Sequence, residues 1–567
     1  MRVMPAVIWR RVTRLIAGNR LFAACLVPAL LLRADAELGY RWQSWFNDSF
    51  SYVSAAVTLT PGTTRPSGYP LYLWLLSPAH SYLLVTASQH LMGLGVAVMI
   101  YALARHRFAV PAWAAVLATL PVLYDGFEIQ LEHLIMADTL FLFLTMAAVT
   151  VVLWSPRPSW RACLAAGLLL GASSTVRPTG LPLLAVFAVY LLIRLMPRPI
   201  RWRPLPSGAA AGPREGLGGS SPRGDGVGGR PPGGQLSGWR GLLAGLAACG
   251  LAFAAPVAAY EAWYSAAHGE FAMTDSTGVF LYSRVMTFAD CSRMSLPTDL
   301  LPLCTTVPPD QRPIAQAYIW TQASPLLRLP EPEFSPTVNQ LAEQFAVRAI
   351  EAQPLDYADT VWDDTVRSFD WNRSVFPNGQ TYDAYLFGYQ SLAVPADPYG
   401  GYPSPAAYYV RGNPATVIIS PFAQVIRVYQ RYVWLPGTLY GVILLVGLFG
   451  IVRPRRPVRA ADTGGYGGSS PREIGPDARP IRWRFLPSGA HQAAILPWLC
   501  SVALIVAPAA TAEFDYRYVT TAVPFACLAA AMALRPAGLT RRGAGGGPDG
   551  GLADAGHDQR NLAADAT

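Results

Sequence analysis

The chain of 567 residues is 52% hydrophobic and only 14% charged, whereas soluble domains average about 25% charged residues. This composition excludes most classes of soluble protein and predicts an all-α polytopic membrane protein with polar insertions. The net charge is +9 and every basic side chain is arginine, which is typical of cytoplasmic loops in membrane proteins. Since no nucleic-acid-binding motif accompanies this charge, the partner we expect is the lipid bilayer and not nucleic acid.

Ten apolar segments approach the length of about 20 residues that a helix needs to cross the hydrocarbon core. They are residues 15–32, 81–104, 108–124, 138–154, 162–176, 180–196, 239–260, 432–452, 493–511 and 518–535. Arginines gather at the N-terminus and in every second connection, at 105–107, 157–161, 194–203, 453–459 and 535–542. Because arginine is concentrated on the cytoplasmic side, the sequence predicts a multi-pass protein of the cell membrane with both termini in the cytoplasm.

The first segment has a second interpretation. Its apolar run at 21–32 follows several arginines and precedes Ala34-Asp35-Ala36, so it also resembles a signal peptide with a small-residue cleavage site. Arg33 and the acidic residues just after it are poor context for cleavage and favour a retained helix. The residues that follow lie outside the membrane in both cases.

The chain divides into transmembrane modules and inserts. The transmembrane parts are a module at 1–196 with its first outer loop at 34–80, single helices at 239–260 and 432–452, and two helices within 493–535. We expect disordered cytoplasmic segments at 197–238, 453–492 and 536–567, which are rich in glycine, proline and polar residues. Residues 261–431 carry enough large apolar side chains for a folded extracytoplasmic domain, α or α+β.

The two cytoplasmic linkers share a repeated string, RPIRWRPLPSGA at 198–209 and RPIRWRFLPSGA at 479–490. A basic strip with a tryptophan is suited to lie on anionic headgroups. Duplicated low-complexity sequence is the alternative.

Two of the seven cysteines lie outside the predicted spans and their linkers. Cys291 and Cys304 both fall in the external region, and an oxidising outer compartment permits a disulfide between them. Two buried free thiols are the alternative. No cysteine spacing resembles a zinc site.

Ionisable and aromatic residues gather in the predicted outer connections. They are Trp45, Asp48, Tyr52, Arg65 and Tyr69 in the first, Glu132, His133 and Asp138 in the second, Arg177 in the third, and Asp515 and Arg517 in the last. A transferase that uses a lipid-phosphate-linked sugar needs a carboxylate to take a proton from the acceptor hydroxyl. It also needs arginines for the phosphate and aromatic faces for the sugar. The alternative is an ordinary outer rim with arginines and aromatics at the headgroups.

The order of four motifs resembles the GT-C superfamily of membrane glycosyltransferases. The motifs are Asp48-Ser49-Phe50-Ser51-Tyr52 with Arg65-Pro66-Ser67-Gly68-Tyr69-Pro70, then Glu132 to Asp138, then the glycine-rich run ending in Arg177-Pro178, and finally Asp515-Tyr516-Arg517-Tyr518. The resemblance covers residues 1–196 well and 493–535 loosely. No catalytic pattern is found in 261–431.

The resemblance implies transfer of a hexose or pentose from a polyprenyl-phosphate carrier to a cell-envelope glycan, lipid or protein outside the membrane, with inversion. The superfamily includes protein mannosyltransferases and actinobacterial arabinofuranosyltransferases. With the 50 glycines, 50 prolines and arginine-only basic residues, typical of GC-rich coding, an actinobacterial source is expected.

The resemblance implies one site residue, and the chemistry of the predicted outer connections indicates the others. Asp48 matches the residue expected to act as catalytic base, and the donor phosphate is assigned to the arginines of the outer connections. The assigned set is Arg65, Arg177 and Arg517 for the phosphate, Trp45, Tyr52 and Tyr69 for substrate stacking, and Glu132, Asp138 and Asp515 as further acidic candidates.

No cofactor is expected at this site. Ser49 stands where many relatives have a second acidic residue, which disfavours a metal-dependent site. A divalent metal held by Asp48, Glu132 and His133 is the alternative. Because no glycine-rich phosphate loop is present, no nucleotide-sugar or ATP site is implied.

Two other function classes fit parts of the sequence. A transporter or flippase of a lipid-linked substrate should place ionisable residues at mid-bilayer, whereas only Arg20, His90 and Arg194 intrude here. A non-catalytic envelope protein would bind glycan through the external region. Its candidate stacking residues are Trp371, Tyr382, Tyr385 and Tyr389, which core packing explains equally well.

Overall fold

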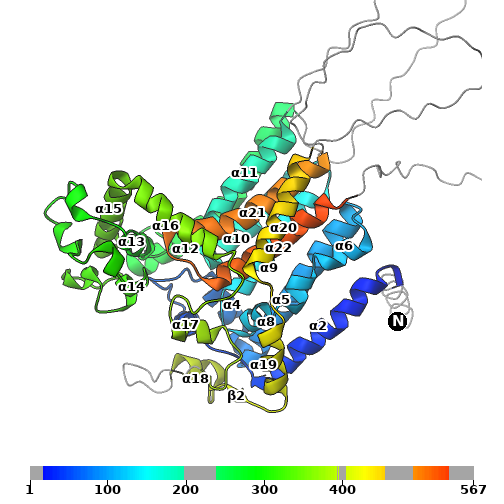
Figure 1. Ribbon diagram of the computed structural model, residues 1–567, viewed down its shortest axis with the longest axis horizontal. Helices are drawn as coiled ribbons and strands as arrows, with labels where there is room; N and C mark the ends of the chain where they lie inside the picture. The colour runs from blue at the N-terminus through cyan, green and yellow to red at the C-terminus, as the bar shows by residue number, and fades with distance from the viewer. Residues whose placement is uncertain (1–16, 197–237, 392–393, 395–403, 454–488, 536–567) are drawn as a thin grey trace, which may run out of the picture. The chain divides into compact units, whose positions relative to one another are not determined.

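The computed structural model describes residues 17–196, 238–391, 394, 404–453 and 489–535 (Figure 1). Within these residues the chain is mostly helical, and its single sheet has two strands. Most of the predicted disordered linkers, the tail and most of the repeated strings lie outside the described residues. Residues 489–492, predicted as the end of a disordered linker, instead form the start of a helix.

Each of the ten apolar segments contains helix. The helices are α2 (Arg20–Gly39), α5 (Tyr82–Ala102), α6 (Ala112–Leu117), α7 (Leu120–Tyr124), α9 (Asp138–Trp154), α10 (Trp160–Val176), α11 (Leu181–Leu195), α12 (Gly238–His268), α20 (Gly437–Val452), α21 (Gly489–Thr511) and α22 (Tyr516–Ala533). In the described part, 4 helices are long and apolar enough to cross a membrane. They number up to 5 if α19 (Phe422–Tyr432) and α20, bent by 59°, form one span. A mostly helical membrane protein is confirmed, and ten spans remain a prediction.

Small residues bring α10 close to α12. A Cβ atom added at Gly167 would collide with the carbonyl oxygen of Cys249, and one at Gly171 with that of Phe253. Glycine at both positions therefore lets the two helix backbones touch, as is common between helices in membranes. This contact fixes the end of α10, where Arg177 follows.

The connections predicted to be outer contain short helices: α3 (Asn47–Thr58) and α4 (Gly68–Leu76) in the first, and α8 (Gly126–His133) in the second. Strand β1 (Tyr40–Arg41) pairs antiparallel with β2 (Val417–Ile418), and α19 packs against α2 (Figure 1). The first loop is therefore joined to the end of the external region.

The region predicted as an external domain at 261–431 contributes to three cores, one of which joins Phe387, Ala423 and Ile426 to the end of α2. α12 continues past residue 260 to His268, and the region then holds α13 (Thr277–Val285), α14 (Ala317–Trp320), α15 (Pro336–Ala352), α16 (Pro354–Arg367), α17 (Gly379–Ala384) and α18 (Pro405–Val410). Apolar residues from Val279 to Ala349 form a core of their own. In contrast, Tyr385 and Tyr409 are buried in the core of the helix bundle, so the later part of the region is built into the bundle.

The predicted disulfide between Cys291 and Cys304 is confirmed. The other five cysteines have free thiols, and all five fall within the predicted spans. Cys291 and Cys304 pack against the separate core of the external region, so the bond closes a loop at the edge of that core.

Replacing both disulfide cysteines with serine is expected to destabilise the external region by about 3 kcal/mol, because the bond restricts a closed loop of about 14 residues in the unfolded chain. Thermal unfolding of the purified variant checks the size of the effect. Mass analysis of the unfolded wild-type chain after alkylation should show five modified thiols without reductant and seven with it. Seven modified thiols without reductant would disprove the bond.

Candidate active site

Asp48 lies in the first turn of α3 between two arginines. Its Oδ1 atom is 3.2 Å from Nη2 of Arg65, and its Oδ2 atom is 3.0 Å from Nη1 of Arg517. Arg65 precedes α4, and Arg517 lies in the first turn of α22. The fold thus brings residues 469 positions apart in the chain into one ion-paired group.

The position of Arg517 is set by Asp515. The Asp515 side chain caps the N-terminus of α22, and its Oδ2 atom is 3.0 Å from Nε of Arg517. The hydroxyl of Tyr385 donates a hydrogen bond of 2.6 Å to Oδ1 of Asp515. One edge of the Arg517 guanidinium is therefore directed at Asp515 and another nitrogen at Asp48.

Arg177 joins the same group through Tyr518. It follows α10 directly and pairs with Asp138, the first residue of α9. Its Cζ atom is 5.1 Å from the centre of the Tyr518 ring, and Cζ of Arg517 is 5.5 Å from the same ring. We name the six residues Asp48, Arg65, Asp138, Arg177, Asp515 and Arg517 the arginine cluster. It holds three carboxylates and three guanidinium groups.

The charge state of Asp48 follows from its neighbours. Burial by itself raises the pKa of the Asp48 carboxyl, but the positive charges of Arg65 and Arg517 outweigh it and lower the pKa below its usual value. The side chain keeps 14% of its surface exposed, against 9% for that of Arg517. Asp48 is therefore an ionised group that solvent or a ligand can reach.

The aromatic residues expected to stack on substrate are mostly core residues. Trp45 is 2% exposed and Tyr69 is fully buried; the Trp45 indole donates to the carbonyl of Pro414 (3.1 Å), and the Tyr69 hydroxyl donates to Gln89 (2.6 Å). Tyr52 is 4% exposed and packs edge-on against Tyr69. Their ring faces are used for packing in this structure, because the first loop folds onto α5 instead of standing free.

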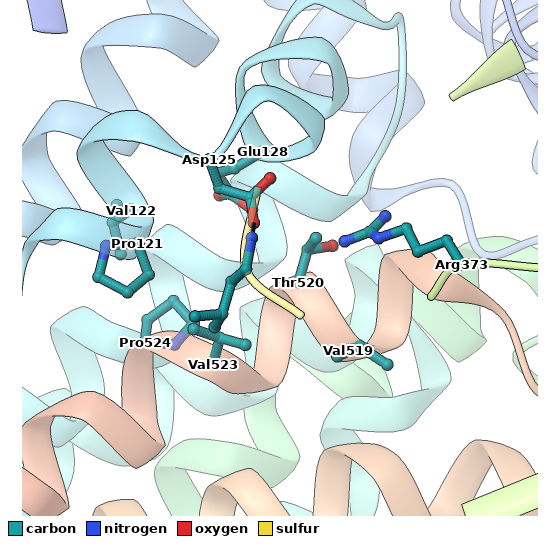
Figure 2. A pocket seen from close by; sticks show the side chains of 10 residues that line it. Pro121, Val122, Asp125, Glu128, Arg373, Val519, Thr520, Val523 and Pro524 are labelled. Carbon is teal, nitrogen blue, oxygen red and sulfur yellow. Dashed lines mark hydrogen bonds between the residues drawn. The ribbon is translucent and has the colours of Figure 1, made fainter. Parts of the chain in front are cut away.

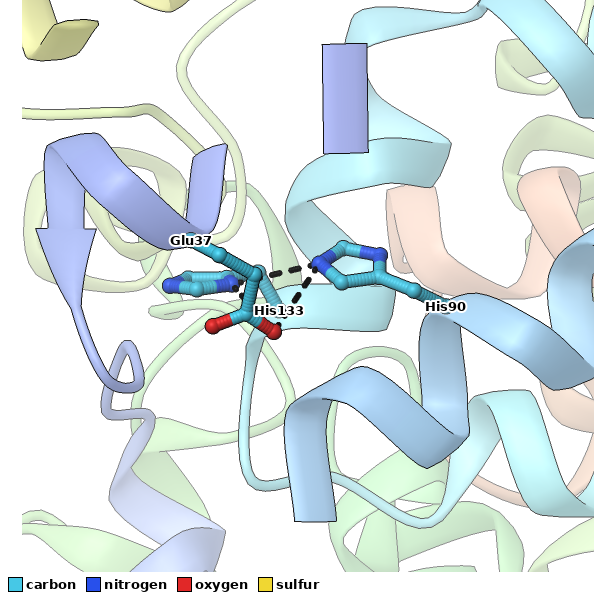
Figure 3. A group of neighbouring side chains, drawn as sticks. All are labelled: Glu37, His90 and His133. Atoms are coloured by element: carbon cyan, nitrogen blue, oxygen red, sulfur yellow. Dashed lines mark hydrogen bonds and ion pairs between the residues drawn. The ribbon is translucent and has the colours of Figure 1, made fainter. Parts of the chain in front are cut away.

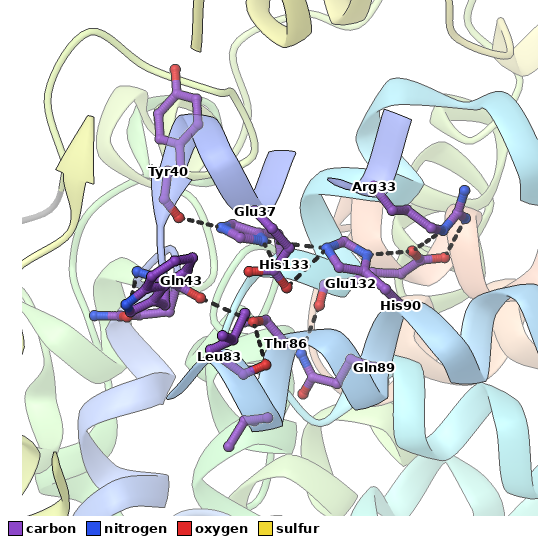
Figure 4. Close-up of polar contacts among 12 residues, drawn as sticks. Arg33, Glu37, Tyr40, Gln43, Leu83, Thr86, Gln89, His90, Glu132 and His133 are labelled. Carbon is purple, nitrogen blue, oxygen red and sulfur yellow. Dashed lines mark hydrogen bonds and ion pairs between the residues drawn. The ribbon is translucent and has the colours of Figure 1, made fainter. Parts of the chain in front are cut away.

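Glu132 lies in a second polar group. Its two carboxylate oxygens accept from Nε and Nη2 of Arg33, both at 2.7 Å, and Oε2 also lies 2.8 Å from Nδ1 of His90 (Figure 4). Because Glu132 is fully buried in these contacts, it is poorly suited to take a proton from a substrate. A metal held jointly by Asp48, Glu132 and His133 does not fit this geometry, since arginines hold the two carboxylates in separate groups.

Sequence reasoning missed Arg33 and Glu37 as members of this second group. Among the described residues, a group with the spacing of metal ligands is formed by Glu37, His90 and His133. His90 could have pointed to this group, because it is an ionisable side chain inside a predicted span. Such residues are costly in a membrane and usually have a partner or a function.

A pocket opens beside the arginine cluster along α22 (Figure 2). Its apolar wall comes from α7 and α22, and its polar groups are Asp125, Glu128 and Arg373, with Arg373 directed toward Thr520. Burial, together with the charges of Glu132 and Asp125, raises the pKa of the Glu128 carboxyl well above its usual value. Thr520 lies one helical turn after Arg517, so the pocket and the cluster share one helix.

Comparison with known proteins supports a family resemblance for part of the chain. Residues 70–208 match the sequence model of the family described as dolichyl-phosphate-mannose-protein mannosyltransferase (PMT). This family is a member of the GT-C superfamily, so the predicted resemblance is confirmed. The matched range includes Asp138 and Arg177, whereas Asp48 and Arg65 precede it and Arg517 follows it. No curated protein and no solved structure gives a significant match.

Proposed function

We propose that this chain, which is similar over residues 70–208 to the PMT family of membrane glycosyltransferases that use lipid-linked sugars, transfers a sugar from a polyprenyl-phosphate carrier to a cell-envelope acceptor. The observation that carries the proposal is the ionised Asp48 between Arg65 and Arg517. It supports the proposal because a carboxylate suited to act as a base lies next to guanidinium groups suited to bind phosphate.

In the proposed reaction, the Asp48 carboxylate takes the proton from the acceptor hydroxyl as that oxygen attacks the anomeric carbon of the sugar. The bond from this carbon to the phosphate oxygen breaks, and polyprenyl phosphate leaves as an anion that needs no proton. Arginines stabilise the growing negative charge on the phosphate. One carboxylate suffices for a direct displacement with inversion, whereas a retaining double displacement also needs a nucleophile.

The ion pairs of Asp48 suggest how donor binding prepares the base. Arg65 and Arg517 are the groups that lower the basicity of Asp48. A donor phosphate that binds these guanidinium groups competes with Asp48 for them. Because losing these contacts raises the carboxyl pKa, Asp48 becomes a stronger base when the donor is in place.

The test is a panel of polyprenyl phosphates that carry different radiolabelled hexoses or pentoses, offered with an acceptor-containing envelope extract to the purified protein in detergent. We expect free polyprenyl phosphate to be released from one sugar class, with the label transferred to the acceptor. Binding of the carriers without cleavage of any would contradict a transferase and favour a transporter or a binding protein.

The pH profile tests the charge state of Asp48. Since its pKa is lowered, the carboxylate stays ionised as the pH falls through the ordinary aspartate value of about 3.9. Its contribution to folding is likewise present above that value and is lost only as the pH falls through the lowered pKa. Replacing Arg65 with glutamine should move the acid limb of kcat/KM to higher pH. Arg293→Gln, which alters an exposed pair with Asp356, is the control, and an unmoved limb in the Arg65 variant would contradict the assignment.

We also propose that both termini are cytoplasmic and that the external region faces outward. Cysteines placed at Glu215 and Gln340 test this with a membrane-impermeant thiol reagent. Gln340→Cys should react in intact cells, since residue 340 is exposed on α15, and Glu215→Cys should react only after permeabilisation. Reaction of both from the same side would contradict this topology.

A further inference from the structure

Three ionisable side chains from three helices converge in the second polar group, which also contains Glu132. Glu37 comes from the end of α2, His90 from α5 and His133 from the end of α8, and they point toward a common centre (Figure 3). One atom from each lies within 4.8 Å of the others. All three are buried, with exposures of 9%, 4% and 0%. We name these three residues the histidine cluster.

The outward nitrogen of each histidine already has an acceptor. Nε2 of His133 is 2.8 Å from the carbonyl oxygen of Tyr40, and Nδ1 of His90 is 2.8 Å from Oε2 of Glu132 (Figure 4). A carbonyl oxygen can only accept, and Oε2 of Glu132 already accepts a hydrogen bond from Nε of Arg33 (2.7 Å). These nitrogens therefore carry the hydrogens, so in the neutral rings Nε2 of His90 and Nδ1 of His133 present lone pairs to each other across 3.3 Å.

The carboxyl group of Glu37 lies beside these two nitrogens. Both of its oxygens are buried with no hydrogen-bond partner among the described residues. The hydroxyl of Thr86 donates to the carbonyl of Trp42, 2.9 Å away. Oε1 of Glu37 is 3.7 Å from Nε2 of His90 and 4.0 Å from Nδ1 of His133. A buried carboxyl group without a hydrogen-bond partner is costly, and a cation bound at this point would give it a partner.

A proton between the two rings would satisfy the histidines but would leave Glu37 without a hydrogen bond. A metal ion satisfies all three groups. Two ligands bound to zinc at 2.0–2.1 Å and at the tetrahedral angle lie about 3.3 Å apart, which matches the separation of the two ring nitrogens. The Glu37 oxygen needs only a small shift to reach the same ion.

We propose that Glu37, His90 and His133 bind a divalent transition-metal ion, with Zn²⁺ as the best fit. Two imidazoles and one carboxylate are a known zinc ligand set. The hydrogen bonds from the rings to Glu132 and to the Tyr40 carbonyl are of the kind that orients histidine ligands of metals. Mg²⁺ prefers a shell of oxygen ligands and does not suit this set.

The position of the site indicates a structural role near the proposed active site. Glu37 lies at the end of α2, from which the chain leads to Asp48, and His133 lies just before Asp138. Backbone hydrogen bonds between Ser44 and His133 (3.0 Å) and between Ile135 and Ser44 (3.2 Å) join these segments. A bound ion would hold both segments against α5. The metal site does not depend on the glycosyltransferase assignment, because its test measures metal and not sugar transfer.

The first test uses the full-length purified protein in detergent. Elemental analysis should find one zinc per chain, and protein stripped with a chelator should bind added Zn²⁺ at one site with submicromolar affinity. Stripping should lower the thermal unfolding temperature, and Zn²⁺ but not Mg²⁺ should restore it. Stripped wild-type protein that binds no Zn²⁺ would overturn the proposal, and this result depends on no variant.

Substitutions that keep the outer hydrogen bonds test which residues bind the metal. His133→Gln retains a donor for the Tyr40 carbonyl and His90→Asn retains one for Glu132, while each removes a ligand nitrogen. Both should weaken Zn²⁺ binding by more than the roughly 10–100-fold that loss of an outer hydrogen-bond partner costs. The matched control is His268→Gln, because Nε2 of His268 also lies 2.7 Å from a backbone carbonyl, that of Pro61, but outside the cluster. Wild-type zinc affinity in both cluster variants would overturn the assignment to these residues.

Discussion

Asp48→Asn is expected to lower sugar transfer by about 10²–10⁴-fold, the usual contribution of a general base, while the protein folds normally. Asparagine has the same size and can still accept a hydrogen bond from Arg65 or Arg517, but it cannot take a proton at neutral pH. Capping of α3 is not the function of this carboxylate. The helix begins at Asn47, and the Ser49 hydroxyl accepts from the backbone N–H of Phe46 (2.9 Å).

The rate of label transfer from the preferred donor measures the effect, with thermal unfolding as the check on folding. Asp356→Asn serves as the control because it removes an exposed Asp–Arg pair with Arg293 and should leave the rate unchanged. If Asp48→Asn transfers sugar at the wild-type rate, the base lies elsewhere. Asp138 would then be the next candidate, since Glu132 is held by Arg33 and His90.

Arg517→Lys and Arg177→Lys are each expected to lower kcat/KM for the donor by about 10–100-fold. A hydrogen bond to a charged group contributes about 1.5–3 kcal/mol, and about 1.4 kcal/mol corresponds to a factor of ten. Lysine keeps the charge but loses the planar fork that holds two oxygens. At position 517 a single ammonium group cannot serve both Asp515 and Asp48, which Arg517 contacts through different nitrogens.

Initial rates at varied donor concentration give the effect of each lysine variant. Arg293→Lys on the exposed pair controls for a general effect of the substitution. Unchanged donor kinetics in both Arg177→Lys and Arg517→Lys would remove these residues from the donor site. Loss of folding instead of donor use would assign them to structure alone.

The sequence predicts the arginine cluster better than its surroundings. Arg177 and Arg517 lie next to ends of apolar segments, and Asp48 and Arg65 lie in the first predicted outer loop; the positive-inside pattern assigns all four to one face of the membrane. Residues at the same face of a bundle can meet even when hundreds of positions separate them. The disulfide followed from the same assignment, because only two cysteines lie in the external region.

The packing of the outer segments could not be predicted in this way. Whether Trp45 and Tyr69 face substrate or core depends on how the first loop folds onto α5, and no periodic pattern in a short loop specifies that. Tyr385 reaches Asp515 only because the later part of the external region enters the bundle core. Such contacts arise from tertiary packing and leave no local signal.

The histidine cluster shows a different limit. Its members come from three segments that give separate and weak signals: an acidic residue after the first span, a histidine within the second and a histidine in the second loop. Their proposed role as metal ligands can be recognised only from the structure, in which the ring nitrogens and the Glu37 carboxyl group face one centre.

A structure of the protein with a non-transferable polyprenyl-phosphate sugar tests the central claim most directly. The account predicts the phosphate within hydrogen-bonding distance of Arg177 and Arg517, with Asp48 released from its arginine contacts and facing the anomeric carbon. A phosphate bound at Arg373 in the neighbouring pocket, with the pairs of Asp48 to Arg65 and Arg517 intact, would contradict it.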